Sequence, residues 1–150
     1  MVDIRFHTGV EDRTTYACRL LRKAARQGAR VVVRGDPAEM DLLDKALWTF
    51  EAQEFVPHVR LRSTQTVAPT LARTPVWLLD EEGAWPADLA PATVLLQMSS
   101  QAARDATEWS RLIELVGDDP EDRRQARQRW RAYEAQGLSV KAVQVGGTSA

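Results

Sequence analysis

The sequence predicts a three-layer α/β domain, in which helices cover both faces of a mostly parallel sheet. Short apolar segments of strand length alternate along the chain with longer segments of helical periodicity. The first two strands and the helix between them also form a strand–helix–strand unit of the length that a parallel crossover needs. This alternation favours one α/β domain over residues 1–145, followed by a flexible tail at 146–150.

The amino-terminal unit shows the pattern most clearly. Residues 2–7 alternate apolar and polar positions, which predicts a short strand. Residues 11–27 have helical periodicity and are closed by Gly28. Residues 30–34 form a continuous valine run between two arginines, which is typical of a parallel strand buried on both faces. The helical face is predicted to consist of Tyr16, Ala17, Leu20, Leu21, Ala24 and Ala25.

A second helix begins after this strand. Asp36 is placed to cap it, Pro37 suits the first helical position, and Glu39 lies three residues after the cap. Its predicted apolar face consists of Leu42, Leu43, Ala46, Leu47 and Phe50. Trp48 lies off this stripe, and we expect it to be exposed.

The remaining segments continue the alternation with less regular spacing. Pro57 makes residues 54–61 an edge strand or a loop. Residues 62–75 and 81–91 lack periodicity and are predicted to be connections. Further strands are predicted at residues 76–79, 93–98, 111–116 and 138–145.

The helix predicted at residues 119–137 has unusual charge spacing. It begins with Asp-Pro and ends with Gly, which are favoured cap residues at those ends. Arg123, Arg127 and Arg131 repeat at intervals of four, so like charges stack along one face at a cost of roughly 0.2–0.5 kcal/mol per pair. Trp130 stands beside this stripe.

Two interpretations of this helix remain open. In the first, Ala126, Trp130 and Tyr133 are the buried face and the arginines are solvated. In the second, cations beside a large ring form a receptor for an anion with an apolar neighbour, such as a peptide C-terminus that ends in an aromatic residue. The helix alone does not decide between them.

The composition of the chain limits the classes of function and the cellular locations that we expect. The chain has 20 basic and 21 acidic side chains, so tight direct binding to nucleic acid is not expected. Its single cysteine, Cys18, excludes an internal disulfide, fits a reducing cytosol and is expected to be a small buried hydrophobe. The sequence shows neither a signal-peptide pattern nor an apolar run of membrane-spanning length. We therefore expect a cytoplasmic protein that does not act at a membrane.

Motifs for catalysis and cofactor binding are missing from the sequence. It contains no G-x-x-x-x-G-K or G-x-G-x-x-G phosphate-binding loop and no G-x-S-x-G turn. His7 and His58 are its only histidines, too few for a metal site with one cysteine. We expect no catalytic residue, metal or cofactor, and favour a binding scaffold. The alternative is a small α/β enzyme, either a hydrolase or a degenerate nucleotide-binding protein.

A cluster of apolar residues falls outside the periodic pattern. Trp48, Phe55 and Pro57 lie at the end of the second helix and in the proline-bearing segment that follows. Such residues either seal the end of the sheet or form an exposed protein interface.

Two motifs give the chain a family resemblance. Residues 43–48, L-D-K-A-L-W, and residues 54–58, E-F-V-P-H, resemble the L-D-x-A-L-W…F-V-P-H signature of the chi subunit of bacterial DNA polymerase III holoenzyme. Residues 126–133 resemble the A-R-x-R-[aromatic]-[basic]-A-Y helix of that family. The order of strands and helices agrees from residue 1 to about 145.

The resemblance implies a fold shaped like a nucleotide-binding domain, without nucleotide or catalysis. Family members bind the acidic C-terminal tail of single-stranded DNA-binding protein and link it to the clamp-loader complex. The tail-binding positions correspond to Arg127, Trp130 and Arg131, where the family often has Tyr followed by Lys in place of Trp130-Arg131. Residues 143–150 match the family poorly, so they identify no pocket wall.

The resemblance also implies a second partner. Family members attach to the clamp-loader complex through a small subunit called psi. The positions that face psi correspond to the region of Trp48, Phe55 and Pro57. The aromatic cluster is therefore expected to contact a psi subunit or another clamp-loader component.

Overall fold

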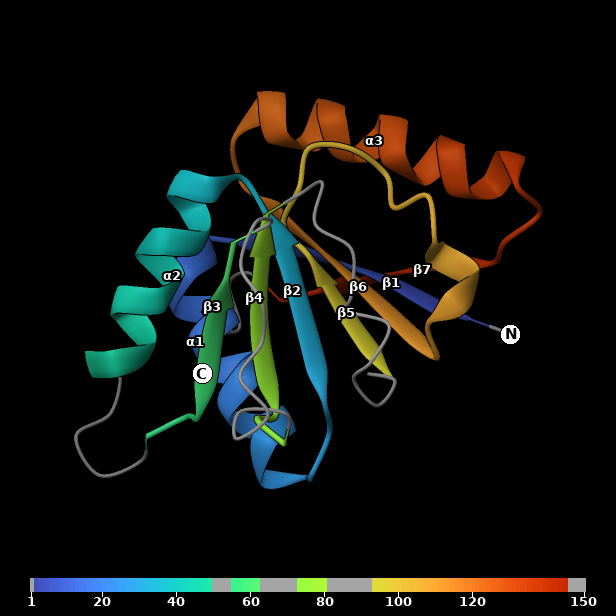
Figure 1. Cartoon of the computed structure of the whole chain (residues 1–150). Coiled ribbons are helices and arrows are strands. Elements are labelled where there is room, and N and C mark those ends of the chain that lie inside the picture. Colours follow the sequence, from blue (N-terminus) through green and yellow to red (C-terminus); the bar gives the residue numbers. More distant parts are fainter. Residues whose placement is uncertain (1, 50–54, 63–72, 81–92, 146–150) are drawn as a thin grey trace.

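The computed structural model describes residues 2–49, 55–62, 73–80 and 93–145. It has the predicted three-layer α/β fold, and its seven-stranded sheet is entirely parallel (Figure 1). The strand order is β3-β4-β2-β5-β6-β1-β7. The strands are β1 (Asp3–Val10), β2 (Val31–Gly35), β3 (His58–Leu61), β4 (Val76–Asp80), β5 (Val94–Gln97), β6 (Arg111–Gly117) and β7 (Val140–Gln144). The helices are α1 (Arg13–Arg26), α2 (Pro37–Thr49), the short 3-10 turn η2 (Ala106–Glu108) and α3 (Pro120–Ala135).

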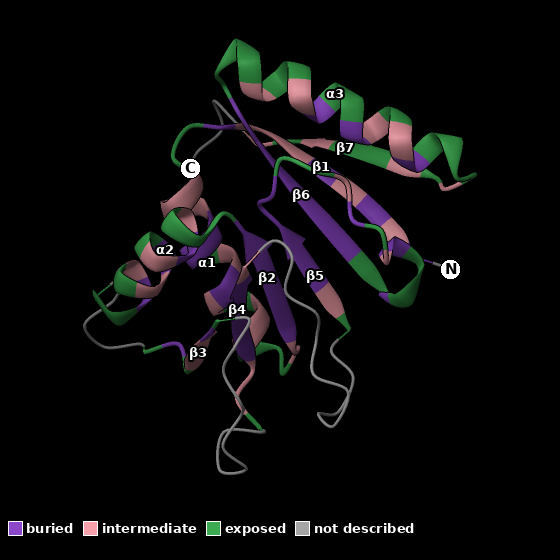
Figure 2. Cartoon of the chain, turned by 45° about the horizontal axis from the view of Figure 1, so that its top comes forward, coloured by how far each residue is buried: buried purple, intermediate pink, exposed green. Residues whose placement is uncertain are grey.

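Alternate side chains of the strands divide the core into two layers. Val32 of β2 belongs to the layer under α3 and η2, whereas Val31 and Val33 belong to the layer under α1 and α2. Figure 2 shows that β2 is buried along its whole length. The continuous valine run is therefore explained by helices on both faces of a central strand, as predicted.

Helix α1 forms as the sequence predicts. The Asp12 side chain accepts a hydrogen bond from the Thr15 amide at 3.1 Å, and Gly28 leaves the helix with φ 77°. Cys18 is only 1% exposed, which confirms it as a small buried residue. Burial raises the pKa of the Cys18 thiol to about 11, so the thiol is protonated and unreactive.

The buried face of α2 differs from the predicted one. Met40, Leu43 and Leu47 are the buried residues, at i, i+3 and i+7. Leu42, which is predicted to lie on this face, is 60% exposed because it lies about 200° around the helix from Met40 and so points away from the buried stripe. Phe50 lies outside the described residues.

The proline-bearing segment ends in an edge strand, which is one of the two predicted outcomes. β3 pairs only with β4 among the described strands, and Pro57 directly precedes it. The His58 ring bonds to the Val56 carbonyl at 2.7 Å and to the Asp44 carboxylate of α2 at 3.0 Å. These bonds tie the start of β3 to α2. Most of the predicted connections 62–75 and 81–91, and the tail 146–150, lie outside the described residues.

Candidate functional site

Helix α3 has the predicted caps. The Asp119 carboxylate accepts a hydrogen bond from the Asp122 amide at 3.1 Å, and Pro120 occupies the first turn. Gly137 leaves the helix with φ 80°, a left-handed conformation that favours glycine. The cap residues therefore set the two ends of the helix that carries the arginine stripe.

The buried side of α3 contains a charged residue that sequence reasoning missed. Ala126 and Tyr133 are buried as the first interpretation expects, and Trp130 is half-buried, but Arg129 is also only 3% exposed. The Arg129 Nε donates to Glu114 Oε1 of β6 at 2.9 Å. The signal lies in Glu114 itself, because a lone carboxylate inside a buried strand needs a cationic or hydrogen-bonding partner.

Tyr133 completes this buried network. Its hydroxyl donates to Glu114 Oε2 at 2.5 Å and accepts from the Ala103 amide at 2.9 Å. Burial raises the pKa of Glu114 to about 7, although the Arg129 charge and the Tyr133 hydrogen bond act in the opposite direction. Burial and the Glu114 charge both raise the pKa of Tyr133, so the phenol remains a donor. The network joins α3, β6 and the segment before η2.

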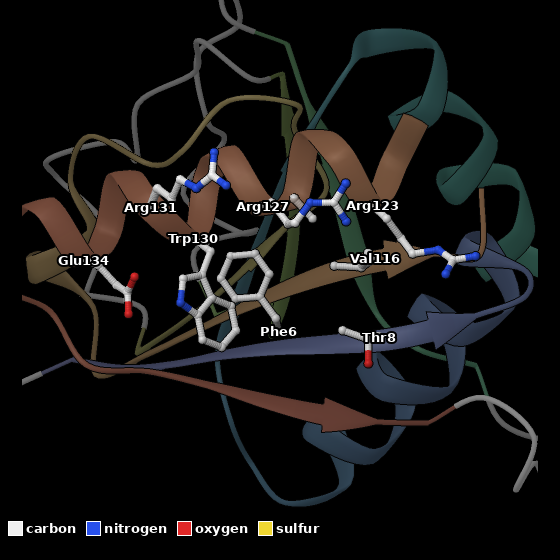
Figure 3. Close-up of a pocket in the computed structure, with 9 residues that line it drawn as sticks. Phe6, Thr8, Val116, Arg123, Arg127, Trp130, Arg131 and Glu134 are labelled. Carbon is white, nitrogen blue, oxygen red and sulfur yellow. The ribbon is translucent and has the colours of Figure 1, made fainter. Parts of the chain in front are cut away.

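A pocket of about 420 Å³ lies between α3 and the strands β1 and β6 (Figure 3). Its floor is apolar. The Phe6 ring of β1 is 1% exposed, and its centroid lies 5.1 Å from that of Trp130, with the planes tilted by 48°. Val116 of β6 and Ala126 of α3 extend this surface. The full lining is Phe6, Thr8, Val116, Arg123, Ala126, Arg127, Trp130, Arg131 and Glu134.

The rim of the pocket is cationic. Arg123, Arg127 and Arg131 are exposed and are spaced along α3, while the Trp130 and Phe6 rings lie between the helix and β1 (Figure 3). Arg123 donates to the Asp118 carbonyl at 2.6 and 3.1 Å. The guanidinium groups of Arg127 and Arg131 form no hydrogen bond or ion pair with any other described residue. Their guanidinium donors are therefore available to a ligand, as a carboxylate-binding site requires.

Two polar residues complete the pocket. Thr8 lies two residues after Phe6 on the same face of β1, and its hydroxyl donates to Gln144 Oε1 of β7 at 3.2 Å. Glu134 is exposed at the opposite end of the lining from Arg123. Its negative charge disfavours an anion at that end, so the pocket has a preferred orientation for an acidic ligand.

The structure brings Arg127, Trp130 and Arg131 to one pocket. Sequence reasoning did not identify Phe6, Thr8 or Val116 as lining residues. β6 leads directly into α3, but nothing local in the sequence places β1 beside that helix.

The second candidate cluster is exposed. Trp48 is 61% exposed, as expected, and Phe55 is 51% exposed. Their ring centroids lie 4.9 Å apart, and the His58 ring meets Trp48 edge-on at 5.2 Å. Pro57 is exposed as well. The Trp48 and Phe55 rings therefore pack against each other at the surface, whereas the His58 side chain beside them is only 1% exposed.

The two candidate sites lie toward opposite edges of the sheet. The aromatic cluster lies on α2 and beside β3, which is one edge strand of the sheet. The α3 pocket is built on β1 and β6, next to β7 at the other edge (Figure 1). Two partners can therefore occupy the two sites without competing for the same surface.

In the part of the chain that the structure describes, no group of three or more His, Cys, Asp or Glu side chains is arranged to hold a metal ion. No described helix is long and apolar enough to cross a membrane.

Some known proteins are similar to this chain in sequence, and others are similar to it in fold. The family model of the DNA polymerase III chi subunit, HolC, matches residues 1–141. The DNA polymerase III subunit chi of Pseudomonas aeruginosa is 35% identical over 131 residues, which cover 86% of this chain and 84% of that protein. Among solved structures, the C-terminal domain of S. cerevisiae Dbp5 has a TM-score of 0.64 at 10% identity, covering 99% of this chain and 93% of that one. The C-terminal part of the Fun30 ATPase domain has a TM-score of 0.53 at 14% identity, covering 75% and 43%. These two structures share the fold alone, whereas the family match and the bacterial relative show that the chain belongs to the DNA polymerase III chi subunit family.

Proposed function

We propose that this chi-family protein is a non-catalytic adaptor that binds the acidic C-terminal tail of single-stranded DNA-binding protein in the α3 pocket. The observation that carries the proposal is that one cavity combines an apolar floor with two arginines, Arg127 and Arg131, whose guanidinium groups bond to none of the residues that the structure describes. An acidic peptide with an apolar last residue needs both features. A solvated arginine face would need neither the pocket nor the half-buried Trp130.

The geometry suggests how the tail lies. Its last side chain occupies the apolar floor between Phe6 and Trp130, and its terminal carboxylate lies against Arg127 and Arg131, one helical turn apart. Acidic side chains further from the terminus extend toward Arg123, away from Glu134. Arginine suits this role because its planar fork can hold a carboxylate with two hydrogen bonds.

The expected affinity follows from opposing terms. Charge-assisted hydrogen bonds contribute roughly 1.5–3 kcal/mol each, and burial of a Phe-sized side chain contributes about as much. The cost of association and of ordering the peptide offsets much of this gain. We therefore expect a dissociation constant near micromolar, about −8 kcal/mol.

Isothermal titration with the tail peptide of the same organism tests the proposal. Binding should be saturable in the wild type and weakened by Arg131→Ala. Arg124→Ala is the matched control, because Arg124 lies on the same helix but pairs with Glu121 at 2.6 Å and does not line the pocket. Equal affinity for wild type and Arg131→Ala would contradict the proposed site.

We propose that the aromatic cluster is the surface that contacts the clamp-loader complex. Trp48, Phe55 and Pro57 present stacked rings and a proline at the surface, which suits a protein interface. We propose that a psi-type subunit binds there. Its position toward the opposite edge of the sheet supports an adaptor that holds both partners at once.

The proposed adaptor has no nucleotide or catalytic role of its own. A thermal melt tests this part, because a ligand at 100 times its Kd stabilises a protein by about 2.7 kcal/mol. The melting temperature should rise with the tail peptide and stay unchanged with nucleotides. A rise with ATP or GTP would favour the degenerate nucleotide-binding alternative.

A further inference from the structure

We propose that a second groove, beneath the carboxyl-terminal half of α1, binds an acidic peptide segment that carries an apolar side chain. This α1 groove has a volume of about 310 Å³, and its lining consists mostly of apolar side chains together with the three cations Arg5, Lys23 and Arg111. It lies on the opposite face of the sheet from the α3 pocket, at the amino ends of β2, β5, β6 and β1. It is therefore a separate surface from the tail-binding site proposed above.

The sheet register explains why the groove has two halves. Residues paired in neighbouring parallel strands share a face of the sheet. In one row of that face, Val31 of β2 is paired with Val94 of β5, Val94 with Arg111 of β6, and Arg111 with Asp3 of β1. In the next row, Ile113 of β6 is paired with Arg5 of β1. The face changes from apolar to charged between β5 and β1, with two arginines and one aspartate in these two rows.

The apolar half lies under the helix. Leu20, Leu21 and Ala24 of α1 line it together with Val94 and Leu96 of β5, and all five belong to or pack against the same core layer. Leu21 and Leu96 are each only 1% exposed, whereas Leu20, Ala24 and Val94 are half-buried. A branched aliphatic side chain fits this half, and its burial supplies the apolar part of the affinity.

The basic half combines two arginines of the sheet with a lysine of the helix. Arg5, Arg111 and Lys23 line it, and no described carboxylate does. Arg5 and Arg111 share one carboxylate beside the groove, Asp3, at 3.0 and 3.4 Å. Asp3 therefore offsets part of the charge of the two arginines, and Lys23 adds a third cation to this half of the groove.

The His7 ring reports the same positive potential. It lines the groove, and burial lowers its pKa, as do the charges of Arg5 and Arg111. Lys141 of β7 is paired with Arg5 and extends the basic surface to the edge of the sheet. An acidic segment that enters from this edge meets cations first and the apolar half second.

An acidic peptide fits this groove better than single-stranded nucleic acid. Nucleic-acid grooves combine cations with aromatic rings on which bases stack. Among the described residues that line the α1 groove, the only ring is that of His7. The Tyr16 hydroxyl lies 2.6 Å from its Nδ1, and the Tyr16 ring packs edge-on against it at 5.8 Å. The groove therefore offers aliphatic packing and charge, without a stacking platform.

The test is an NMR titration of the full-length protein with the blocked peptide acetyl-Glu-Asp-Leu-Asp-Glu-amide. The blocked C-terminus removes the carboxylate that the α3 pocket is proposed to hold. Saturable shift changes are expected at the amides of Leu20, Ala24 and Val94. They should persist in an Arg127→Glu/Arg131→Glu variant, which separates this groove from the α3 pocket.

Charge reversal provides the matched comparison. Lys23→Glu should weaken the peptide at least fivefold, and Arg111→Glu should do the same. Lys45→Glu, an exposed lysine of α2, should change the affinity less than twofold. Shift changes confined to α3, a titration that does not saturate, or tighter binding of an oligo-dT probe at the same amides would overturn the proposal. Equal binding by wild type and Lys23→Glu would overturn it as well.

Discussion

Glu114 of β6 and Arg129 of α3 form an ion pair at 2.9 Å, with side chains that are 0% and 3% exposed. Arg129 lies directly before Trp130, so this pair also positions the residue that walls the α3 pocket. A buried pair gains little over apolar packing, but removing one partner leaves an uncompensated charge. The α3 pocket therefore depends on a contact that faces away from the ligand.

Loss of Arg129 should destabilise the protein strongly. We expect Arg129→Met to lower the free energy of unfolding by about 3–5 kcal/mol, because Glu114 keeps its burial and loses its cation. Urea denaturation measures the effect. The control is Arg124→Met, which removes an exposed pair with Glu121 and should cost at most about 1 kcal/mol. Similar losses in both variants would contradict the role of the buried pair.

The free energy of unfolding should depend on pH through the protonation of Glu114. Its pKa rises from 4.5 to about 7 on folding, so the folded state holds the proton more tightly. The contribution of the protonated Glu114 to the free energy of unfolding is fully present below pH 4.5 and is lost as the pH rises through 7. The shift in the Glu114 pKa corresponds to a contribution of about 3 kcal/mol at most.

Comparison with Glu114→Gln isolates this contribution, because the variant lacks the titration and keeps the other groups. Between pH 4.5 and 7.5, the wild type should lose stability relative to Glu114→Gln in urea denaturation. Parallel profiles for the two proteins would show that Glu114 has the same pKa in the folded and unfolded states.

The exposed aromatic cluster should contribute to partner binding and little to stability. We expect Trp48→Ala or Phe55→Ala to weaken binding of a psi-type subunit by at least tenfold, because stacked rings are typical anchors of protein interfaces. Surface plasmon resonance measures the affinity, and circular dichroism checks the fold. Leu42→Ala is the control, since Leu42 is 60% exposed on the same helix and outside the stacked rings. Gross unfolding of Trp48→Ala would place that ring in the core instead.

Direct binding to single-stranded DNA should be weak. The formal net charge is −1, and nonspecific affinity depends on the number of phosphates that a protein neutralises. A gel shift with an oligonucleotide at physiological salt should show no complex at submicromolar protein. A submicromolar complex would contradict the adaptor role, in which the DNA is contacted by the partner protein.

The parts of the fold that follow local rules were predictable. The valine run of β2 and the caps of α3 depend on neighbouring residues, so sequence patterns predict them. Leu42 shows the limit of the periodic argument, because the core contacts only the narrow stripe of Met40, Leu43 and Leu47 on this helix and leaves the neighbouring leucine exposed. Arg129 shows another limit, since a charged residue is buried only when a distant strand supplies its partner.

The candidate site was predictable only on its helical side. Arg127, Trp130 and Arg131 share a helix, so their spacing reveals that they lie together. Phe6 and Val116 join them because β1 lies between β6 and β7, an order set by the crossover through α3. That order is a long-range property, and no local pattern in β1 or β6 encodes it.

The most direct test of the account compares a free and an amidated tail peptide from the same organism's single-stranded DNA-binding protein. Isothermal titration at low salt should give a dissociation constant near micromolar for the free acid. Amidation should weaken binding tenfold or more, as should Arg131→Ala, because each removes one side of the carboxylate–guanidinium contact. The affinity should also fall as salt rises, since the rim is exposed. If the amidated peptide binds as well as the free acid, the arginines of α3 are a solvated face and the proposed pocket is wrong.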